Sequence, residues 1–415
     1  MKVLVIGGGG REHALVRALS HDPGVTSLHC APGNAGTAAL CDNHVVDPLD
    51  PSAVTDLAGR LGAGLVVVGP EAPLVAGVGD ALRAAGIACF GPDARAAQIE
   101  GSKAFAKDVM AVAGVPTAES AVCTTELEAE EALARFGPPY VVKDDGLASG
   151  KGVVVTDDID AAADHARACE RVVIEEYLDG PEVSLFALCD GTTVLPLQPA
   201  QDFKRAYDGD EGPNTGGMGA YTPLTWAPHD LVEHVTETVL RPTVDELRRR
   251  QTPYVGVLYA GLALTSRGVR VVEFNARFGD PETQVVLDRL ATPLGGLLQS
   301  AAIGALGDAP ALEWHPGAAV TVVVAAENYP GSPVTGDAIS GIAEAEQVPG
   351  AYVLHAGTRL DAETGTLLTA GGRVLDVVGT GATLEDAHDT AYAAVRRIGI
   401  RGAHHRSDIA LTARI

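Results

Sequence analysis

Short apolar runs alternate with amphipathic stretches over the first hundred residues. The runs Val3 to Ile6, Leu65 to Gly69 and Ile87 to Phe90 have the length of buried strands, and a helix is expected from Arg11 onward. This alternation is typical of a parallel α/β sheet with helices on its faces. Gly91-Pro92 ends the last of these strands, so we place a first domain boundary near residue 100.

Two further patterns follow this boundary. Ser102 is a candidate N-cap for a helix that Gly114 ends, and strands and helices then alternate around a glycine-rich segment up to about residue 190. Farther on, the apolar runs Val255 to Thr265 and Val269 to Phe274 flank the turn residues 266–268, which predicts an antiparallel pair. The second region is therefore expected to contain a small lid and an antiparallel sheet.

The last hundred residues begin with an apolar run from Ala318 to Ala325 and end with a helix that Thr383 is expected to cap. They contain no dense polar motif, so we expect them to form a domain that packs on the others. The fold class is a multidomain combination of α/β and α+β. The predicted domains are residues 1–100, 101–190, 191–315 and 316–415.

Composition narrows the functional classes. The net charge of −24 disfavours nucleic acid and anionic membranes, since both bind clustered Lys and Arg. The run Arg248 to Arg250 is expected to close a helix, where cations suit the helix dipole. Six cysteines without CxxC spacing indicate neither a zinc site nor a disulfide framework. Without a signal-like start or a long apolar segment, we expect a cytoplasmic protein.

Glycines cluster where the first strand meets the first helix, in VLVIGGGGREHAL. The backbone N–H groups of Gly8, Gly9 and Gly10 could face an anion at the positive helix end, and an ordinary tight turn is an equally good interpretation. A dinucleotide fingerprint needs a third glycine at a set spacing, which is missing here.

A second glycine-rich segment, VVKDDGLASGKGVVV, departs from the P-loop, which has four residues between its glycines and Ser or Thr after its lysine. A hairpin around Gly150, Lys151 and Gly152 that folds over a triphosphate fits better. Lys143, on the strand before it, is expected to meet phosphate charge. The alternative is a solvated lysine at a strand end.

In VVIEEYLDGPEVS an apolar strand runs into Glu175 and Glu176, and a turn with Glu182 follows. Such a passage can offer main-chain groups to an adenine edge and a carboxylate to ribose hydroxyls. By itself the segment fits two surface glutamates better than an adenosine site.

The strongest local motif is VRVVEFNARFGDPETQ, in which Glu273, Asn275 and Arg277 alternate with apolar residues and should share one face of a strand. Because Mg²⁺ needs only one or two protein oxygens beside waters and phosphates, Glu273 and Asn275 suffice as ligands. Arg277 could then stabilise charge on a phosphoryl group. An ion pair between Glu273 and Arg277 is the alternative.

The stretch QDFKRAYDGDEGPNTGGMGAY is long and polar and includes Asp202, Lys204, Asn214 and Thr215. We expect a long irregular loop, which in a compact domain is functional or disordered, and the apolar segments around it favour function. The histidines show no HExxH pattern, and His404-His405 is expected to be a surface feature.

Taken together, these segments resemble the glycinamide ribonucleotide synthetase family of ATP-grasp ligases over nearly the full length. The matching segments stand in family order: GGREHAL, APGNAGT, VGPEAPLV, EGSKAFAKD, GLASGKGV, IEEYLDG, GPNTGGMGAY, EFNARFGDPETQ, HAGT and GGRVL. The resemblance implies a Rossmann-like pre-ATP-grasp domain, an ATP-grasp fold and a small C-terminal domain. It also implies ligation of glycine to 5-phosphoribosylamine through a glycyl phosphate, with ATP consumed and Mg²⁺ or Mn²⁺ required.

The resemblance also assigns roles by motif. Lys103, Lys143 and Gly150 to Gly152 would meet ATP phosphates, and Glu175, Glu176, Leu178 and Glu182 would surround adenosine. Glu273 and Asn275 would bind the metal, and Arg277 would stabilise charge. The expected contacts to glycine and the sugar phosphate are Gly8, Gly9, Gly10, Asn34, Glu71, Asp202, Lys204, Asn214, Thr215, Gly216, Gly217 and Asp280.

The sequence departs from the family at Asp144, where an alanine is usual, and in a shortened stretch before VVIEEYL. The first alternative is another ATP-grasp ligase or a purine-pathway carboxylase, which GPNTGGMG and GDPETQ disfavour. A catalytically idle nucleotide sensor or a Rossmann-type oxidoreductase is the second. We expect a monomer or weak dimer.

Overall fold

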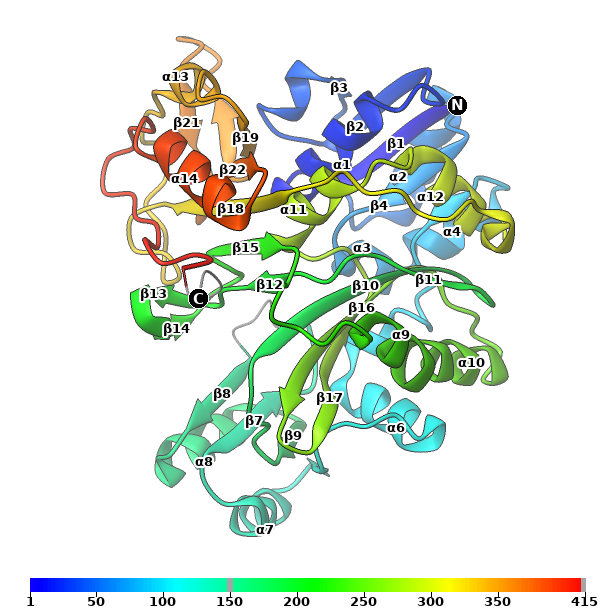
Figure 1. Ribbon diagram of the computed structural model, residues 1–415. Helices are drawn as coiled ribbons and strands as arrows, with labels where there is room; N and C mark the ends of the chain where they lie inside the picture. The colour runs from blue at the N-terminus through cyan, green and yellow to red at the C-terminus, as the bar shows by residue number, and fades with distance from the viewer. Residues whose placement is uncertain (148–151, 412–415) are drawn as a thin grey trace.

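The computed structural model describes residues 1–147 and 152–411 and arranges them around four larger sheets (Figure 1). The first sheet is parallel throughout, with the strand order β3-β2-β1-β4-β5, as the alternating pattern predicted. Its strands are β1 Lys2–Gly7, β2 Ser27–Pro32, β3 Asp42–Asn43, β4 Leu65–Val68 and β5 Cys89–Phe90. The helices of this part are α1 Gly10–Ser20, α2 Pro51–Leu61, α3 Glu71–Val75, α4 Val78–Ala84 and α5 Gln98–Gly101.

Both faces of this sheet are buried. Leu4 and Ile6 of β1 belong to one apolar core, while Val3 and Val5 belong to another. Because side chains alternate along a strand, the run of apolar residues in β1 fills two cores at once.

A small lobe at the bottom of Figure 1 contains the second sheet, with the order β6-β9-β7-β8 and antiparallel pairing. The helix α6 Lys103–Ala113 leads into it, with Ser102 as its N-cap, as predicted. The strands are β6 Ser120–Cys123, β7 Tyr140–Asp144, β8 Val153–Thr156 and β9 Val172–Glu175, and the helices are α7 Glu126–Phe136 and α8 Ile159–Ala168.

The third sheet, β11-β10-β16-β17, crosses the middle of the molecule. Its strands are β10 Glu182–Asp190, β11 Val194–Pro196, β16 Val255–Thr265 and β17 Gly268–Asn275, and β16 and β17 form the predicted antiparallel pair. The neighbouring helices are α9 Leu231–Val235, α10 Arg241–Arg249, α11 Glu282–Arg289 and α12 Leu294–Ala302. Arg249 and Arg250 at the end of α10 pair with Glu246, so this basic run belongs to a helix end.

The fourth sheet, β12-β15-β18-β22-β19, joins strands from two distant parts of the chain. Its strands are β12 Gln201–Asp202, β15 Gly219–Thr222, β18 Ala318–Ala325, β19 Ala351–His355 and β22 Arg373–Gly381. Two small hairpins, β13 Arg205–Tyr207 with β14 Glu211–Asn214 and β20 Thr358–Leu360 with β21 Leu367–Thr369, lie beside it, as do α13 Ile342–Glu346 and α14 Leu384–Val395. This sheet spans the predicted domain boundary at residue 315.

All six cysteines are free thiols, and four of them are buried. Among the described residues, no helix is long and apolar enough to span a membrane.

Candidate active site

The charges of three lysines act on Glu273 at the end of β17: Lys103, Lys143 and Lys204. Lys103, the first residue of α6, donates through Nζ to the carbonyls of Asp144 and Gly146 at 2.8 and 3.0 Å. It therefore holds the beginning of the glycine-rich hairpin. Gly152 closes the described part of that hairpin, since its carbonyl accepts from the Asp144 N–H at 2.7 Å. The predicted phosphate contacts Gly150 and Lys151 lie outside the described residues.

Lys143 is buried on β7, so it is not the solvated lysine that was the alternative interpretation. Its Nζ lies 2.9 Å from the Glu175 carboxylate on the adjacent strand β9 and donates to the Val272 carbonyl at 3.0 Å. Lys107, on the inner face of α6, approaches the same carboxylate at 3.1 Å. One buried carboxylate thus compensates two buried ammonium groups. Burial of any of these charges without an opposite charge beside it would be strongly unfavourable.

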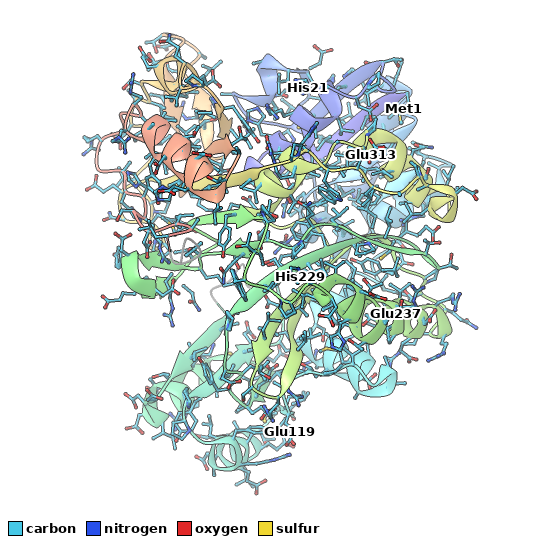
Figure 2. All side chains as sticks on the ribbon, in the orientation of Figure 1. Met1, His21, Glu119, His229, Glu237 and Glu313 are labelled. Atoms are coloured by element: carbon cyan, nitrogen blue, oxygen red, sulfur yellow. The ribbon has the colours of Figure 1, made fainter. Side chains whose placement is uncertain are left out.

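The other residues expected around adenosine are arranged less uniformly. The Glu176 side chain turns outward to Arg267 at 2.9 Å and accepts from the Glu119 N–H at 3.1 Å. Figure 2 places Glu119 at the outer end of the small lobe. Leu178 is half-buried and follows this strand end. The side chains of Glu175 and Glu176 therefore serve ion pairs within the protein, and only main-chain groups of this strand end remain for a base.

Glu273 and Asn275 end β17, and Arg277 lies two residues beyond the strand. Arg277 pairs with Glu71 at 3.3 Å and Glu100 at 3.2 Å and donates to Asn275 Oδ1 at 3.1 Å. The alternative ion pair between Glu273 and Arg277 does not form. These partners, despite burial, raise the pKa of Arg277, so the guanidinium is held charged.

The Glu273 carboxylate has no hydrogen-bond or ion-pair partner among the residues that the structure describes. Burial alone would raise its pKa, but Lys204, Lys143 and Lys103 lower it overall. Glu273 is therefore an ionised, uncommitted oxygen donor that faces three ammonium groups.

A divalent metal fits this end of β17. Within residues 1–147 and 152–411, no cluster of three or more His, Cys, Asp or Glu side chains could enclose a metal by itself. Mg²⁺ usually completes its shell with waters and phosphate oxygens, so one free carboxylate and the Asn275 amide oxygen are a sufficient protein contribution.

Lys204, the third of these lysines, lies in a cluster with acidic side chains. Lys204 donates to the Glu182 carboxylate, and its pKa is raised well above the usual value because Glu182 and Asp202 outweigh burial. Burial raises the pKa of Asp202 to about 7, against the lowering effect of Lys204. Glu282, at the start of α11, adds negative charge here and accepts from Ser184 at 3.0 Å.

The glycine loop between β1 and α1 is closely packed. Gly9 is the N-cap of α1, and its N–H donates to Glu12 at 2.6 Å. A Cβ on Gly10 would lie 1.9 Å from Asp376 Oδ2, so only glycine fits there. Asn34 donates to the carbonyls of Gly8 and His355 at 3.0 and 2.7 Å, and its Oδ1 accepts two backbone N–H groups. The Asn34 amide thus orders the loop and is committed to the protein.

The polar stretch 201–221 differs from the long irregular loop that we expected. It forms β12, the β13–β14 hairpin and β15: β12 pairs with β15 and β13 with β14 inside the stretch, and β15 also pairs with the remote strand β18. Thr215 bonds twice to Lys204 through its N–H and Oγ1, at 2.7 and 2.8 Å, so the turn from Asn214 to Gly217 is held beside Lys204.

Residues of the C-terminal part reach this region, although this part contains no dense polar motif and we expected it to pack on the others. Arg373 of β22 lies 3.2 Å from the Asp280 carboxylate. Gln284 donates to Asp280 and Asp376, both at 2.8 Å. Sequence reasoning missed Arg373, Asp376 and Glu100. The motif GGRVL contained Arg373, but a single arginine in a strand pattern carries no chemical signature.

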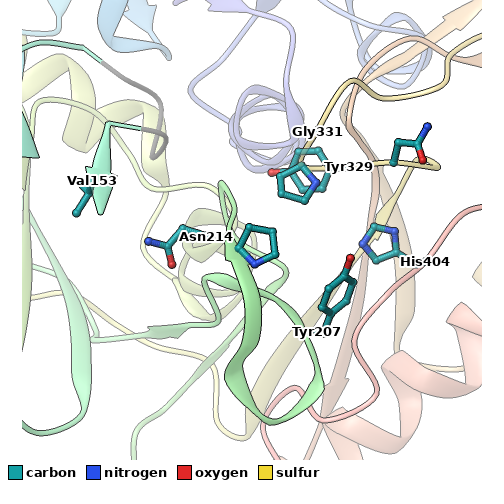
Figure 3. A pocket seen from close by; sticks show the side chains of 9 residues that line it. Val153, Tyr207, Asn214, Tyr329, Gly331 and His404 are labelled. Atoms are coloured by element: carbon teal, nitrogen blue, oxygen red, sulfur yellow. The ribbon is translucent and has the colours of Figure 1, made fainter. Parts of the chain in front are cut away.

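A pocket of about 670 Å³ opens beside the Asn214 turn (Figure 3). Tyr207, Tyr329 and His404 supply rings, and Val153 and Asn214 line its other side. His404 is half-buried, while His405 is exposed. The pocket joins the small lobe, the hairpin β13–β14 and the C-terminal part.

Three family models match the chain in order. The models described as Phosphoribosylglycinamide synthetase, N domain, ATP-grasp (A) domain and C domain match residues 1–100, 101–283 and 319–412. A phosphoribosylamine–glycine ligase of Streptomyces coelicolor is 70% identical over 415 residues, which are 100% of this chain and 99% of that protein.

Solved structures agree on the fold. The crystal structure of a phosphoribosylamine–glycine ligase from Thermotoga maritima is 32% identical, with a TM-score of 0.84 over 99% of this chain and 100% of that one. An N5-carboxyaminoimidazole ribonucleotide synthetase from Thermus thermophilus has a TM-score of 0.65 over 95% of this chain and 98% of that one. At 20% identity, the second likeness concerns the fold alone.

Proposed function

The chain belongs to the phosphoribosylglycinamide synthetase family and is an ATP-dependent ligase of purine biosynthesis; from that premise we propose how its residues join glycine to 5-phosphoribosylamine. The observation that carries the proposal is the uncommitted Glu273 carboxylate opposite Lys103, Lys143 and Lys204. Such a set matches a metal-bound triphosphate, whose oxygens need both ammonium donors and a shared cation.

ATP phosphates would lie between these lysines and the end of β17, with the adenosine toward Glu175, Glu176, Leu178 and Glu182. Glu273 and Asn275 would hold Mg²⁺ or Mn²⁺, which when bound offsets phosphate charge. Lys143 is fixed from two sides, by Glu175 and the Val272 carbonyl, so its ammonium is already oriented before ATP arrives.

In the first step a glycine carboxylate oxygen attacks the γ-phosphorus, the bond to ADP breaks, and glycyl phosphate forms. Arg277 is suited to stabilise the charge that spreads over the phosphoryl oxygens, since Glu71 and Glu100 hold its planar group in place. In the second step the amine attacks the acyl carbon and phosphate leaves, so that one difficult condensation becomes two easier reactions.

The acceptor 5-phosphoribosylamine carries both a phosphate and an amine. We place the acceptor phosphate at the positive end of α1 beside Gly8 and Gly10, because the Gly9 N–H already donates to Glu12, and we place the acceptor amine at Asp280. If a Cβ were built on Gly9, it would lie 3.7 Å from Asp280 Oδ2, so the two features adjoin. Asp202 and Lys204 would border the glycine side, and the turn from Asn214 to Gly217 would border the acceptor side.

Release of ADP tests this function, with glycine varied and 5-phosphoribosylamine generated in place. We expect ADP release to depend on both substrates and on Mg²⁺ or Mn²⁺. Release of ADP that is independent of either substrate would refute the assignment. A purine-pathway carboxylase would instead require bicarbonate. ADP release with bicarbonate in place of glycine would therefore indicate a carboxylase.

The absence of a described membrane-spanning helix and the excess of acidic residues support a cytoplasmic enzyme without nucleic-acid partners. A monomer or weak dimer remains our prediction for its assembly.

A further inference from the structure

Two side chains of the C-terminal part hold both backbone polar groups of Gly216. Its N–H donates to the Tyr329 hydroxyl at 2.9 Å, and its carbonyl accepts from Arg373 Nη1 at 2.7 Å. Thr215 and Gly217, on either side, are fixed by the Thr215 hydroxyl, which accepts from the Gly217 N–H at 2.9 Å. The turn therefore owes its position to residues more than a hundred positions away in sequence.

The same guanidinium also holds Asp280. Nη1 of Arg373 donates to the Asp280 carbonyl at 2.7 Å, and Nη2 lies 3.2 Å from carboxylate Oδ2. The other carboxylate oxygen accepts from Gln284 Nε2 at 2.8 Å. Asp280 and other acids raise the pKa of Arg373 despite burial, so the charge persists. One planar group thus joins the Gly216 turn to Asp280.

Close packing makes the position of Asp280 sensitive to this link. A Cβ on Gly217 would lie 2.4 Å from Pro281 Cδ, and Gly217 has a φ of +114° that side chains disfavour. The turn therefore rests directly on the segment that carries Asp280. Gly9 also adjoins Asp280, since a Cβ on Gly9 would lie 3.7 Å from Asp280 Oδ2. Movement of the turn would change the distance between Asp280 and the glycine loop.

We propose that Arg373 is a positioning residue for the acceptor amine: it locks the Gly216 turn and Asp280 in the arrangement that binds 5-phosphoribosylamine. The inference rests on the proposed function, because it takes Asp280 and the glycine loop as the acceptor site. Arg373 acts through Asp280 and the Gly216 carbonyl. Lysine could replace its charge but could not reach all three acceptors in one plane.

The test compares Arg373→Ala, Arg373→Lys and Tyr329→Phe in the full-length enzyme. Arg250→Ala is the matched control: the Arg250 side chain is 22% exposed, as that of Arg373 is, and it also pairs with carboxylates, which are those of Asp108 and Glu246. Steady-state kinetics give the KM of each substrate. Hydroxylamine in place of the acceptor reports glycine activation alone, since it converts glycyl phosphate to the hydroxamate and releases phosphate.

For Arg373→Ala we expect kcat/KM for 5-phosphoribosylamine to fall on the order of 10²-fold, the cost of a misplaced reacting group. The KM of ATP and the rate of hydroxamate formation should stay within about threefold, because glycine activation does not need the acceptor site. Arg373→Lys should recover about tenfold of the loss, and Tyr329→Phe should lose about fivefold, since each keeps part of the lock. Arg250→Ala should lower the melting temperature without this selective effect.

Equal losses in ligation and hydroxamate formation would overturn the inference, as would an unchanged kcat/KM for the acceptor. If Arg373→Ala does not fold, Arg373→Lys and Tyr329→Phe decide by the same selectivity. Failure of the wild-type enzyme to ligate glycine would instead refute the proposed function, so the two failures are distinguishable.

Discussion

Asp376→Asn should stabilise the protein at alkaline pH and have little effect at acidic pH. Asp376 is 1% exposed on β22, and its Oδ1 has no hydrogen-bond partner among the described residues. Burial, reinforced by the Asp280 charge, raises the pKa of Asp376 from 3.8 to about 7. An asparagine keeps an oxygen that can accept from Gln284, but it cannot ionise.

The magnitude follows from this shift. Roughly three pKa units correspond to a ceiling of about 4 kcal/mol at about 1.36 kcal/mol per unit. Between about pH 4 and 7 the folded state binds a proton that the unfolded state has released, so stability falls as pH rises through this window. At pH 8 we expect Asp376→Asn to raise the free energy of unfolding by about 1 to 3 kcal/mol, since relaxation reduces the ceiling. At about pH 3.5, below the unfolded-state pKa, the two proteins should agree within about 0.5 kcal/mol, because Asp376 is then mostly protonated in the folded and the unfolded states alike.

Calorimetry or fluorescence melting of both proteins from about pH 3.5 to 8.5 measures the difference across the whole window between the two pKa values. Asp157→Asn, at an exposed position, is the control and should give the same small difference at every pH. A difference for Asp376→Asn that does not change with pH, or a variant that is less stable at pH 8, would refute the reasoning.

Three further predictions concern the residues around the end of β17 that we assign to ATP phosphates and the metal. Lys143→Met and Lys107→Met each remove one of two cations from Glu175, so both should lower stability by about 2 kcal/mol, below the cost of leaving a buried charge wholly unpaired. Only Lys143→Met should reduce kcat/KM for ATP, on the order of 10²-fold, and equal kinetic losses would contradict its phosphate role. Glu273→Gln should raise the Mg²⁺ concentration needed for half-maximal rate far more than it lowers the melting temperature; the reverse pattern would remove it from the metal site. Arg277→Ala should slow transfer of labelled oxygen from the glycine carboxylate to phosphate by on the order of 10² to 10³, with partial recovery in Arg277→Lys. Unlabelled phosphate from active enzyme would exclude glycyl phosphate.

Elements with a local signature were predictable. The antiparallel pair β16 and β17 follows from two apolar runs around a Ser-Arg-Gly turn, and β18 spans the predicted residues Ala318 to Ala325. Ser102 and Thr383 cap their helices through hydrogen bonds to the third helical residue. Such features depend on residues within a few positions of each other, so a single sequence contains them. The family, the fold class and the ligase activity, predicted from ordered motifs, are confirmed by the comparisons.

Partners that are distant in sequence were not predictable. Arg277 was expected to share a strand face with Glu273, but it lies beyond the strand and pairs with Glu71 and Glu100. Lys107 occupies an ordinary helix position whose burial depends on Glu175 in another strand. The polar stretch 201–221 appeared irregular because its strands are short and polar, and because one of them, β15, pairs with β18, about a hundred residues later. Contacts between residues this far apart leave no periodic pattern or fixed spacing in a single sequence. The individual site roles and the domain boundaries stay predictions.

The fourth sheet cannot be completed until late in synthesis of the chain. Strand β15 pairs with β18, Gly219 opposite Val322, and roughly a hundred residues separate them. At about 5 to 20 residues per second, a ribosome needs roughly 5 to 20 seconds to supply the partner strand. During that interval β15 has an unpaired edge, which is the kind of surface that nascent chains must keep from aggregating. Arg373 emerges later still, so the link between Arg373, Asp280 and the Gly216 turn can form only when synthesis is almost complete. The parallel N-terminal sheet, in contrast, can form while the ribosome is still translating.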